Sequence, residues 1–139
     1  MAGYAGTPLL KKLGIEEGHR VLLRNAPDGL PQELKDYAAM RPTKHLDVAL
    51  LFAKSLAAFP GELAALIKTI KADGAIWIAW PKKASGIKTD LNENAIRDRA
   101  LRTSLVDVKV CAIDETWSGL KFVIRKEHRL ARLPRTGKA

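Results

Sequence analysis

The chain has 139 residues, 47% of them hydrophobic and 28% charged, with one cysteine and a formal net charge of +9. This length fits a single globular domain. No apolar run is longer than that of residues 48–53, which is too short for a membrane-spanning helix of about 20 residues. A single cysteine excludes an internal disulfide, and the sequence has no Cys/His cluster with metal-ligand spacing, so we expect no metal site.

The first half of the chain predicts two helices and two strands. A helix is expected over residues 8–13, where Gly14 ends it because glycine tolerates the left-handed conformation of a helix end. The run of Arg20 and three apolar residues at 21–23 predicts a buried strand, and residues 31–40 predict a short helix with one apolar side. Residues 48–52 form a near-continuous apolar run, which is typical of a strand covered on both faces.

The second half continues this alternation and ends in a hairpin. Asp90 precedes Glu93 by three residues, which is a carboxylate version of the capping box at the start of a helix. A first helix is expected to begin at residues 60–62 and to end in a basic turn and a glycine at 71–74, followed by a strand over 75–80 and a loop over 81–86. A second helix is expected over 91–104. Two strands, over 106–113 and 120–125, are joined by the loop 114–119.

Buried strands that alternate with helices predict a parallel sheet with helices on both faces. Right-handed crossovers are the strong default for its βαβ units, and the short last loop makes the final pair of strands antiparallel. We therefore expect one three-layer α/β domain over residues 1–125, with a mostly parallel sheet of about five strands that ends in an antiparallel hairpin.

Residues 126–139 are expected to form a basic tail. Residues 125–139 carry one acid and six basic side chains, so they contribute +5 and the other 124 residues contribute +4. Such a tail could be an electrostatic arm for nucleic acid or an acidic partner, or a solvated terminus. The N-terminal residues lack the basic and apolar segments of a secretory signal, so we expect a cytoplasmic protein that makes no membrane contact. The six basic side chains of residues 125–139, counted above for the tail, belong to Arg125, Lys126, Arg129, Arg132, Arg135 and Lys138.

This order of elements resembles the class I S-adenosylmethionine-dependent methyltransferases. Residues 13–22 resemble the approach to their first strand, 47–51 their fourth strand and 71–78 the approach to their fifth, and the final hairpin is similar to their last two strands. The resemblance implies a Rossmann-like fold. Residues 80–86 and 114–121 also look like a family of short bacterial proteins of unknown function, and that resemblance implies no activity.

Three departures from the methyltransferase pattern argue against a working enzyme. The loop 24–29, which should hold the cofactor, contains one glycine and Pro27, which has no N–H to donate. Residues 40–44, where the family holds the ribose with an acid, contain no acid, and residues 53–55 lack the family's motif for base methylation. We therefore expect no bound cofactor and a non-catalytic binding module.

Ligands of open α/β sheets bind at the carboxyl ends of the parallel strands. Lys82, Lys83 and Ser85, followed by Lys88, could bind phosphate there or form a solvated basic loop. Asp114 and Glu115 could act as an acid–base pair, bridge to Lys82 or Lys83, or form a charged hairpin tip. The full set of expected binding residues is Asn25, Asp28, Lys54, Ser55, Trp80, Lys82, Lys83, Ser85, Asp114, Glu115 and Trp117.

The aromatic residues near this edge have different expected roles. Trp77 and Trp80 lie three positions apart on one strand and should point to opposite faces, Trp77 into the core and Trp80 toward a pocket wall. Trp117 could stack on a ligand ring or fold back over the core. Cys111 is expected to be a small buried residue, and the three histidines, His19, His45 and His128, to lie at the surface.

Three functions remain open at this point. The first is a non-catalytic Rossmann-like module that binds an anionic small molecule or an acidic macromolecule. The second is a reduced S-adenosylmethionine-dependent methyltransferase. The third is a nucleic-acid accessory protein that uses Arg97, Arg102 and the basic tail, although a solvated helix face explains the same arginines.

Overall fold

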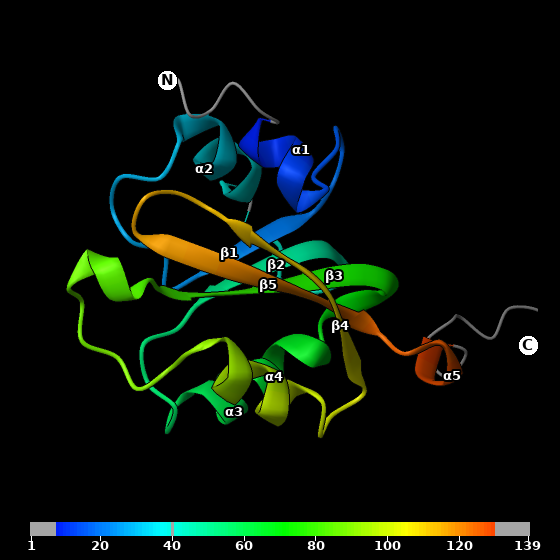
Figure 1. Cartoon of the computed structure of the whole chain (residues 1–139). Coiled ribbons are helices and arrows are strands. Elements are labelled where there is room, and N and C mark those ends of the chain that lie inside the picture. Colours follow the sequence, from blue (N-terminus) through cyan, green and yellow to red (C-terminus); the bar gives the residue numbers. More distant parts are fainter. Residues whose placement is uncertain (1–7, 40, 130–139) are drawn as a thin grey trace, which may run out of the picture.

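The computed structural model describes residues 8–39 and 41–129. Within these ranges the chain forms one five-stranded sheet with helices on both faces (Figure 1). The helices are α1 (Leu9–Leu13), α2 (Gln32–Ala38), α3 (Phe59–Ile67), α4 (Glu93–Ala100) and α5 (Lys126–Arg129), with a short 3-10 helix, η2, at Lys83–Ser85. The strands are β1 (Val21–Arg24), β2 (Leu46–Phe52), β3 (Ile70–Pro81), β4 (Leu105–Ala112) and β5 (Trp117–Ile124). None of the described helices is long and apolar enough to cross a membrane.

The sheet has the strand order β1-β2-β3-β5-β4. β1, β2 and β3 run parallel, whereas β5 is antiparallel to both β3 and β4, so β4 has the same direction as the first three strands. The expected mostly parallel sheet with a terminal antiparallel hairpin is confirmed. The carboxyl ends of β1, β2, β3 and β4 therefore lie along one edge of the sheet, which we call the rim.

The central strand β3 sends alternate side chains into two apolar layers. Ile76 and Ile78 pack with α3 and α4, whereas Trp77 packs with α1 and α2, and all three are fully buried. Trp77 and Trp80 lie in different layers, as their spacing predicted. The indole N–H of Trp77 donates to the carbonyl of Leu13 at 3.0 Å, which ties the end of α1 to the sheet.

The crossover through α2 departs from the right-handed default. The connections β1-α2-β2, β2-α3-β3 and β3-α4-β4 all step in the same direction across the sheet. α2 covers one face, however, while α3 and α4 cover the other (Figure 1). Crossovers that step in one direction with helices on opposite faces have opposite hands. Because right-handed crossovers are the rule, we assign the left-handed one to the connection through α2, since α2 is the one crossover helix on the face that it shares with α1.

The third helix is shorter than predicted. α3 ends at Ile67, and residues 70–74, expected in the last turn of the helix, belong to β3. The pairing of β2 with β3 is irregular here, because Leu46 pairs with Ile70 but Val48 pairs with Ala75. Gly74 allows this irregularity, since a Cβ at that position would lie 2.8 Å from the carbonyl oxygen of Leu46.

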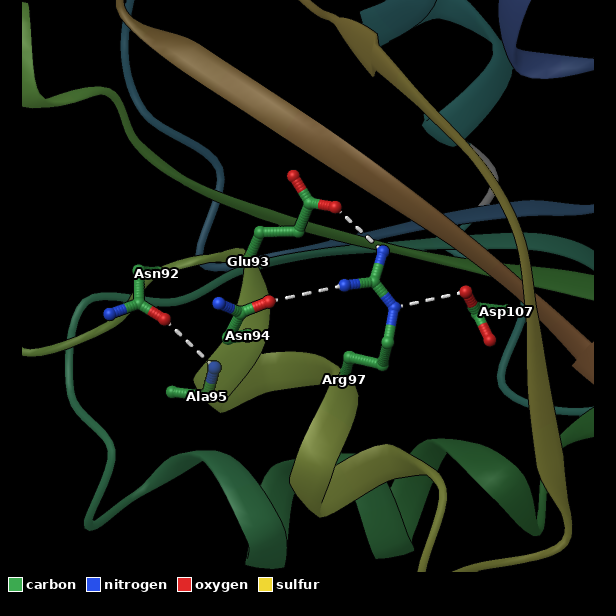
Figure 2. Close-up of polar contacts among 6 residues, drawn as sticks. All are labelled: Asn92, Glu93, Asn94, Ala95, Arg97 and Asp107. Carbon is green, nitrogen blue, oxygen red and sulfur yellow. Dashed lines mark hydrogen bonds and ion pairs between the residues drawn. The ribbon is translucent and has the colours of Figure 1, made fainter.

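The start of α4 also differs from the prediction. The N-cap is Asn92, whose Oδ1 accepts a hydrogen bond from the N–H of Ala95 at 2.8 Å (Figure 2), and not Asp90. The helix ends at Ala100 rather than near residue 104. The Arg125 guanidinium donates to the carbonyl of Leu101, which follows the helix, at 2.9 Å.

The beginning of the expected basic tail is ordered into α5. Arg129 donates from Nε to the carbonyl of Ile124 at 2.7 Å, so this part of the chain folds back onto the end of β5. The other tail residues named above, Arg132, Arg135 and Lys138, lie outside the described residues.

Candidate functional site

Two loops at the rim are joined by side-chain hydrogen bonds. The hydroxyl of Thr89, in the loop after β3, donates to the carbonyl of Lys54, in the loop after β2, at 2.6 Å. Next to it, Oδ1 of Asp90 accepts from the N–H of Leu56 at 2.7 Å. This contact across the chain explains why Asp90 does not cap α4. The two bonds hold the loops side by side at the carboxyl ends of β2 and β3.

These loops enclose an open pocket of about 840 Å³, which we call the rim pocket. A volume of this size is within the range of small-molecule sites. The pocket is lined by Lys54 and Ser55 from the first loop, by Trp80 and Pro81 from β3, and by Lys83 and residues 86–92 from the second loop. Lys54, Ser55, Trp80 and Lys83 are thus the predicted binding residues that the structure brings together in one cavity.

The inner wall of the rim pocket is apolar. Trp80 is only 8% exposed, Pro81 and Leu91 are buried, and Ile87 is half-buried. No described residue accepts a hydrogen bond from the indole N–H of Trp80, in contrast to Trp77. A wall of this kind favours a ligand that has an apolar part.

The mouth of the rim pocket is basic. Lys54, Lys83 and Lys88 are exposed there. All 15 aspartates and glutamates lie in the described ranges, and none forms an ion pair with these three lysines. The one carboxylate that lines the pocket, Asp90, accepts the backbone N–H described above. Three cations therefore face one acid across the opening.

Neighbouring lysines of the second loop have different roles. The Lys82 ammonium donates to the backbone carbonyl of Asp114 at 2.7 Å, and its N–H donates to the carbonyl of Thr116 at 2.8 Å. Lys82 therefore fastens this loop to the β4–β5 hairpin, while Lys83 is left free to line the pocket. Ser85 completes the η2 turn, because its hydroxyl donates to the carbonyl of Lys82 at 2.7 Å.

The hairpin acids do not form the carboxylate bridge to Lys82 or Lys83 considered from the sequence. Oδ1 of Asp114 accepts the N–H groups of Thr116 and Trp117, both at 2.8 Å, so this carboxylate shapes the turn. Its contact with Lys82 goes through the backbone carbonyl and not through the carboxylate. Glu115 is exposed and has no ion-pair partner in the described part of the chain.

Trp117 belongs to the core and not to a binding surface. It is the first residue of β5 and is only 4% exposed. Its ring meets Phe52 at 5.1 Å between centroids and at 89°, an edge-to-face arrangement. Of the two roles left open by the sequence, the structure shows the core role, because Trp117 belongs to the same buried cluster as Phe52 and Trp77.

The loop after β1 lies apart from the rim pocket. The amide of Asn25 donates to the Glu62 carboxylate at the start of α3, at 2.8 Å, and Asp28 is exposed. Neither residue lines the rim pocket. The expected convergence of loops is therefore present for the ends of β2, β3 and β4, but these two residues do not share the cavity.

Two arginines singled out in the sequence, Arg97 of α4 and Arg102 just after it, form ion pairs with neighbouring acids. Figure 2 shows the Arg97 guanidinium between Glu93, at 2.6 Å, and Asp107 of β4, at 3.0 Å. Arg102 pairs with Asp98 at 2.8 Å. The contact with Asp107 joins α4 to β4, and the paired guanidinium groups fit the solvated helix face considered from the sequence.

The cysteine and the histidines differ in burial: His45 and His128 are exposed, as expected, whereas Cys111 and His19 are intermediate. Cys111 is half-buried rather than buried, and burial raises the pKa of its thiol although Lys12 and Lys109 act in the opposite direction. His19 is half-buried and accepts the N–H of Glu16 through Nδ1 at 3.1 Å. No group of three His, Cys, Asp or Glu side chains in the described ranges could hold a metal ion.

The comparisons with known proteins concern the fold. No family model matches the sequence, and no curated protein does. A protein of the NADB-Rossmann superfamily from Streptococcus agalactiae is similar in structure, with a TM-score of 0.50 and 9% identity over 86% of this chain and 68% of that chain. A ribosomal protein methylase from Lactobacillus delbrueckii subsp. bulgaricus has a TM-score of 0.43, 10% identity and coverage of 76% and 57%.

The tRNA methyltransferase TrmK of B. subtilis has a TM-score of 0.44 and 8% identity over 78% of this chain and 50% of that chain. This chain thus spans half to two thirds of the length of these three proteins. The match to the Streptococcus protein confirms the Rossmann-like fold, and at 9% identity it shows the fold alone.

Sequence reasoning missed Thr89, Asp90 and Asn92 as residues of the pocket. Each lies in the loop between β3 and α4, a position that favours ligand contacts in this fold. A signal for Thr89 and Asp90 was present, since two short polar residues before a helix often bond to backbone groups. Their partners, Lys54 and Leu56, are 35 and 34 positions away and could not be identified from local spacing.

Proposed function

We propose that this protein is a Rossmann-like binding module that takes an anionic small molecule in the rim pocket. The observation that carries the proposal is the set of three unpaired lysines, Lys54, Lys83 and Lys88, at the mouth of a cavity with an apolar inner wall. Cations without a carboxylate partner gain most from an anionic ligand, particularly beside a wall that excludes water.

The arrangement of the acids supports binding without a reaction. Asp90 and Asp114 both use carboxylate oxygens to accept backbone N–H groups, so neither is placed as a free acid or base. The pocket wall at Trp80 adds a preference for a ligand with an apolar or planar part. A nucleotide-like anion combines these features.

The test is a thermal-shift and calorimetric titration with inorganic phosphate, common nucleotides, S-adenosylmethionine and S-adenosylhomocysteine. A ligand at about 100 times its dissociation constant should stabilise the fold by about 2.7 kcal/mol. The variant Lys54→Gln/Lys83→Gln/Lys88→Gln should abolish the shift. The matched control Lys44→Gln/Lys68→Gln/Lys126→Gln, which removes three exposed lysines elsewhere, should retain it.

Two results would reject the proposal. A shift produced only by the two methionine-adenosine compounds would make the protein a reduced methyltransferase. A shift that both triple variants lose equally would show binding to overall positive charge and not to the rim pocket.

A further inference from the structure

A second group of lysines lies on the α1 face of the sheet, away from the rim pocket. Lys109 of β4 and Lys121 of β5 are directly opposite each other in the antiparallel pair. Lys12 of α1 reaches the same strand, where its ammonium donates to the carbonyl of Ala112 at 3.1 Å. We call Lys12, Lys109 and Lys121 the β4 lysine cluster.

The charges of this cluster are not compensated within the protein. Like charges directly opposite on neighbouring strands destabilise a sheet. None of the 15 aspartates and glutamates, all of which the structure describes, forms an ion pair with these lysines. Lys121 is also half-buried beside Gly14, and both its burial and the nearby Lys109 lower the pKa of its ammonium. The free protein therefore keeps an arrangement that costs stability.

The β4 lysine cluster lies beside an open edge of the sheet, which is formed by β4. β4 is the last strand in the order and, among the described strands, pairs only with β5 (Figure 1). It carries the two large apolar side chains that are exposed in the described ranges, Val108 at 50% and Val110 at 45%. Consecutive side chains of a strand point to opposite faces. Lys109 therefore lies on the face of the cluster, and Val110 on the other.

Protection of the edge explains only part of this pattern. A bulge between Asp107 and Lys109, and a lysine on an edge strand, both discourage unwanted strand pairing. Lys12 and Lys121 are not on the edge, however, and a protective role gives no reason for placing them next to Lys109. Charges gathered from three elements indicate an acidic binding partner.

Two other partners fit less well. A second copy of the chain related by a two-fold axis through this edge would bring the two lysine clusters together, which is repulsive. Single-stranded nucleic acid binds on exposed aromatic rings as well as cations, and none of the described Phe, Tyr or Trp side chains is exposed. An acidic protein segment satisfies the charge without these conflicts.

We propose that the β4 edge is a docking site for an acidic, extended segment of a partner protein, which adds to the sheet as a sixth strand. Backbone groups of the segment pair with β4, and its alternate side chains go to opposite faces. Carboxylates on one face meet Lys12, Lys109 and Lys121, while apolar side chains on the other face meet Val110.

The test uses two labelled peptides of about eight residues, one alternating Glu and Val and one with the same residues in two blocks. Fluorescence anisotropy should show that the alternating peptide binds about tenfold more tightly, because only its pattern puts acids on one face. The amide signals of residues 105–112 should shift on binding, and those of residues 82–92 should not. Lys12→Gln/Lys109→Gln/Lys121→Gln should lose the binding, and the control Lys44→Gln/Lys68→Gln/Lys126→Gln should keep it.

Three outcomes would overturn the proposal. Equal affinity for both peptides, or equal loss in both triple variants, would show that only net charge is sensed. Displacement of the peptide by polyuridylate at lower concentration would favour RNA as the partner. Shifts confined to the rim loops would move the interaction to the other site. A melting curve for each variant confirms that it is folded before binding is compared.

Discussion

Two tryptophans of one strand differ by a hydrogen bond, which can be measured. Trp77 donates to the carbonyl of Leu13, whereas no described residue accepts from Trp80. Trp77→Phe leaves a buried carbonyl without its donor, which costs about 1–3 kcal/mol beyond the loss of ring volume. Urea unfolding should therefore show Trp77→Phe to be less stable than Trp80→Phe by about this amount. Equal losses would mean that the hydrogen bond contributes nothing.

The loss of folding stability at acidic pH depends in part on Asp47. Partial burial raises the pKa of this carboxyl, but hydrogen bonds from the N–H of Arg20 and from Lys71, with the charge of Lys71, outweigh it and hold the pKa below its ordinary 3.8. A lowered folded-state pKa stabilises the fold above the unfolded value, and this contribution disappears as the pH falls through the lowered pKa.

Unfolding measured from pH 6 downward should therefore show a smaller loss of stability below about pH 4 for Asp47→Asn than for the natural protein. Lys71→Met should flatten the curve less than Asp47→Asn does, because the bond from Arg20 remains. A curve for Asp47→Asn that superimposes on that of the natural protein would contradict this assignment.

At the level of elements, two glycines that look alike in the sequence should respond in opposite ways to alanine. A Cβ at Gly74 would lie 2.8 Å from the backbone oxygen of Leu46, where β2 and β3 approach closely, whereas Gly61 in α3 has nothing within 4 Å. Overpacking costs about 1–3 kcal/mol, and replacing a helical glycine by alanine gains about 0.5–1 kcal/mol. Thermal unfolding should show Gly74→Ala melting lower and Gly61→Ala higher than the natural chain; a Gly74→Ala protein of unchanged stability would refute the close approach.

The same region shows where local patterns stop being informative. Ile70 continues the helical spacing of Leu63 and Leu66, yet it lies in β3, because an apolar residue at that spacing suits a buried strand equally well. Asp90 and Asn92 are both good N-cap residues, and the choice was decided by the bond from Leu56 to Asp90. Tertiary contacts settled both boundaries, whereas the strand identities came correctly from the apolar runs.

For the whole molecule, chain direction predicted the rim but not its details. The ends of β2 and β3 meet because parallel strands share one edge, and this places Lys54 near Lys83 without knowledge of side chains. Lys82 and Lys83 are indistinguishable in the sequence, and only the position of the hairpin carbonyl of Asp114 separates their roles. The left-handed crossover through α2 could not be predicted from the sequence either, because the general rule predicts a right-handed one.

The net charge of +9 leads to a prediction about salt. Excess positive charge destabilises a compact fold by self-repulsion, and Lys109 opposite Lys121 adds a local part of about 0.2–1 kcal/mol. Salt shortens the screening length to about 10 Å at 0.1 M, so the melting temperature should rise between about 0.02 and 0.3 M sodium chloride. The variant Lys109→Gln/Lys121→Gln should melt about 1–4 °C higher than the natural protein at low salt, and its melting temperature should depend less on salt. The control Lys44→Gln/Lys126→Gln removes the same charge from exposed positions, and its melting temperature should change less. Identical salt curves for the two double variants would show that the cross-strand pair carries no special repulsion, and that the cluster on β4 costs the free protein nothing.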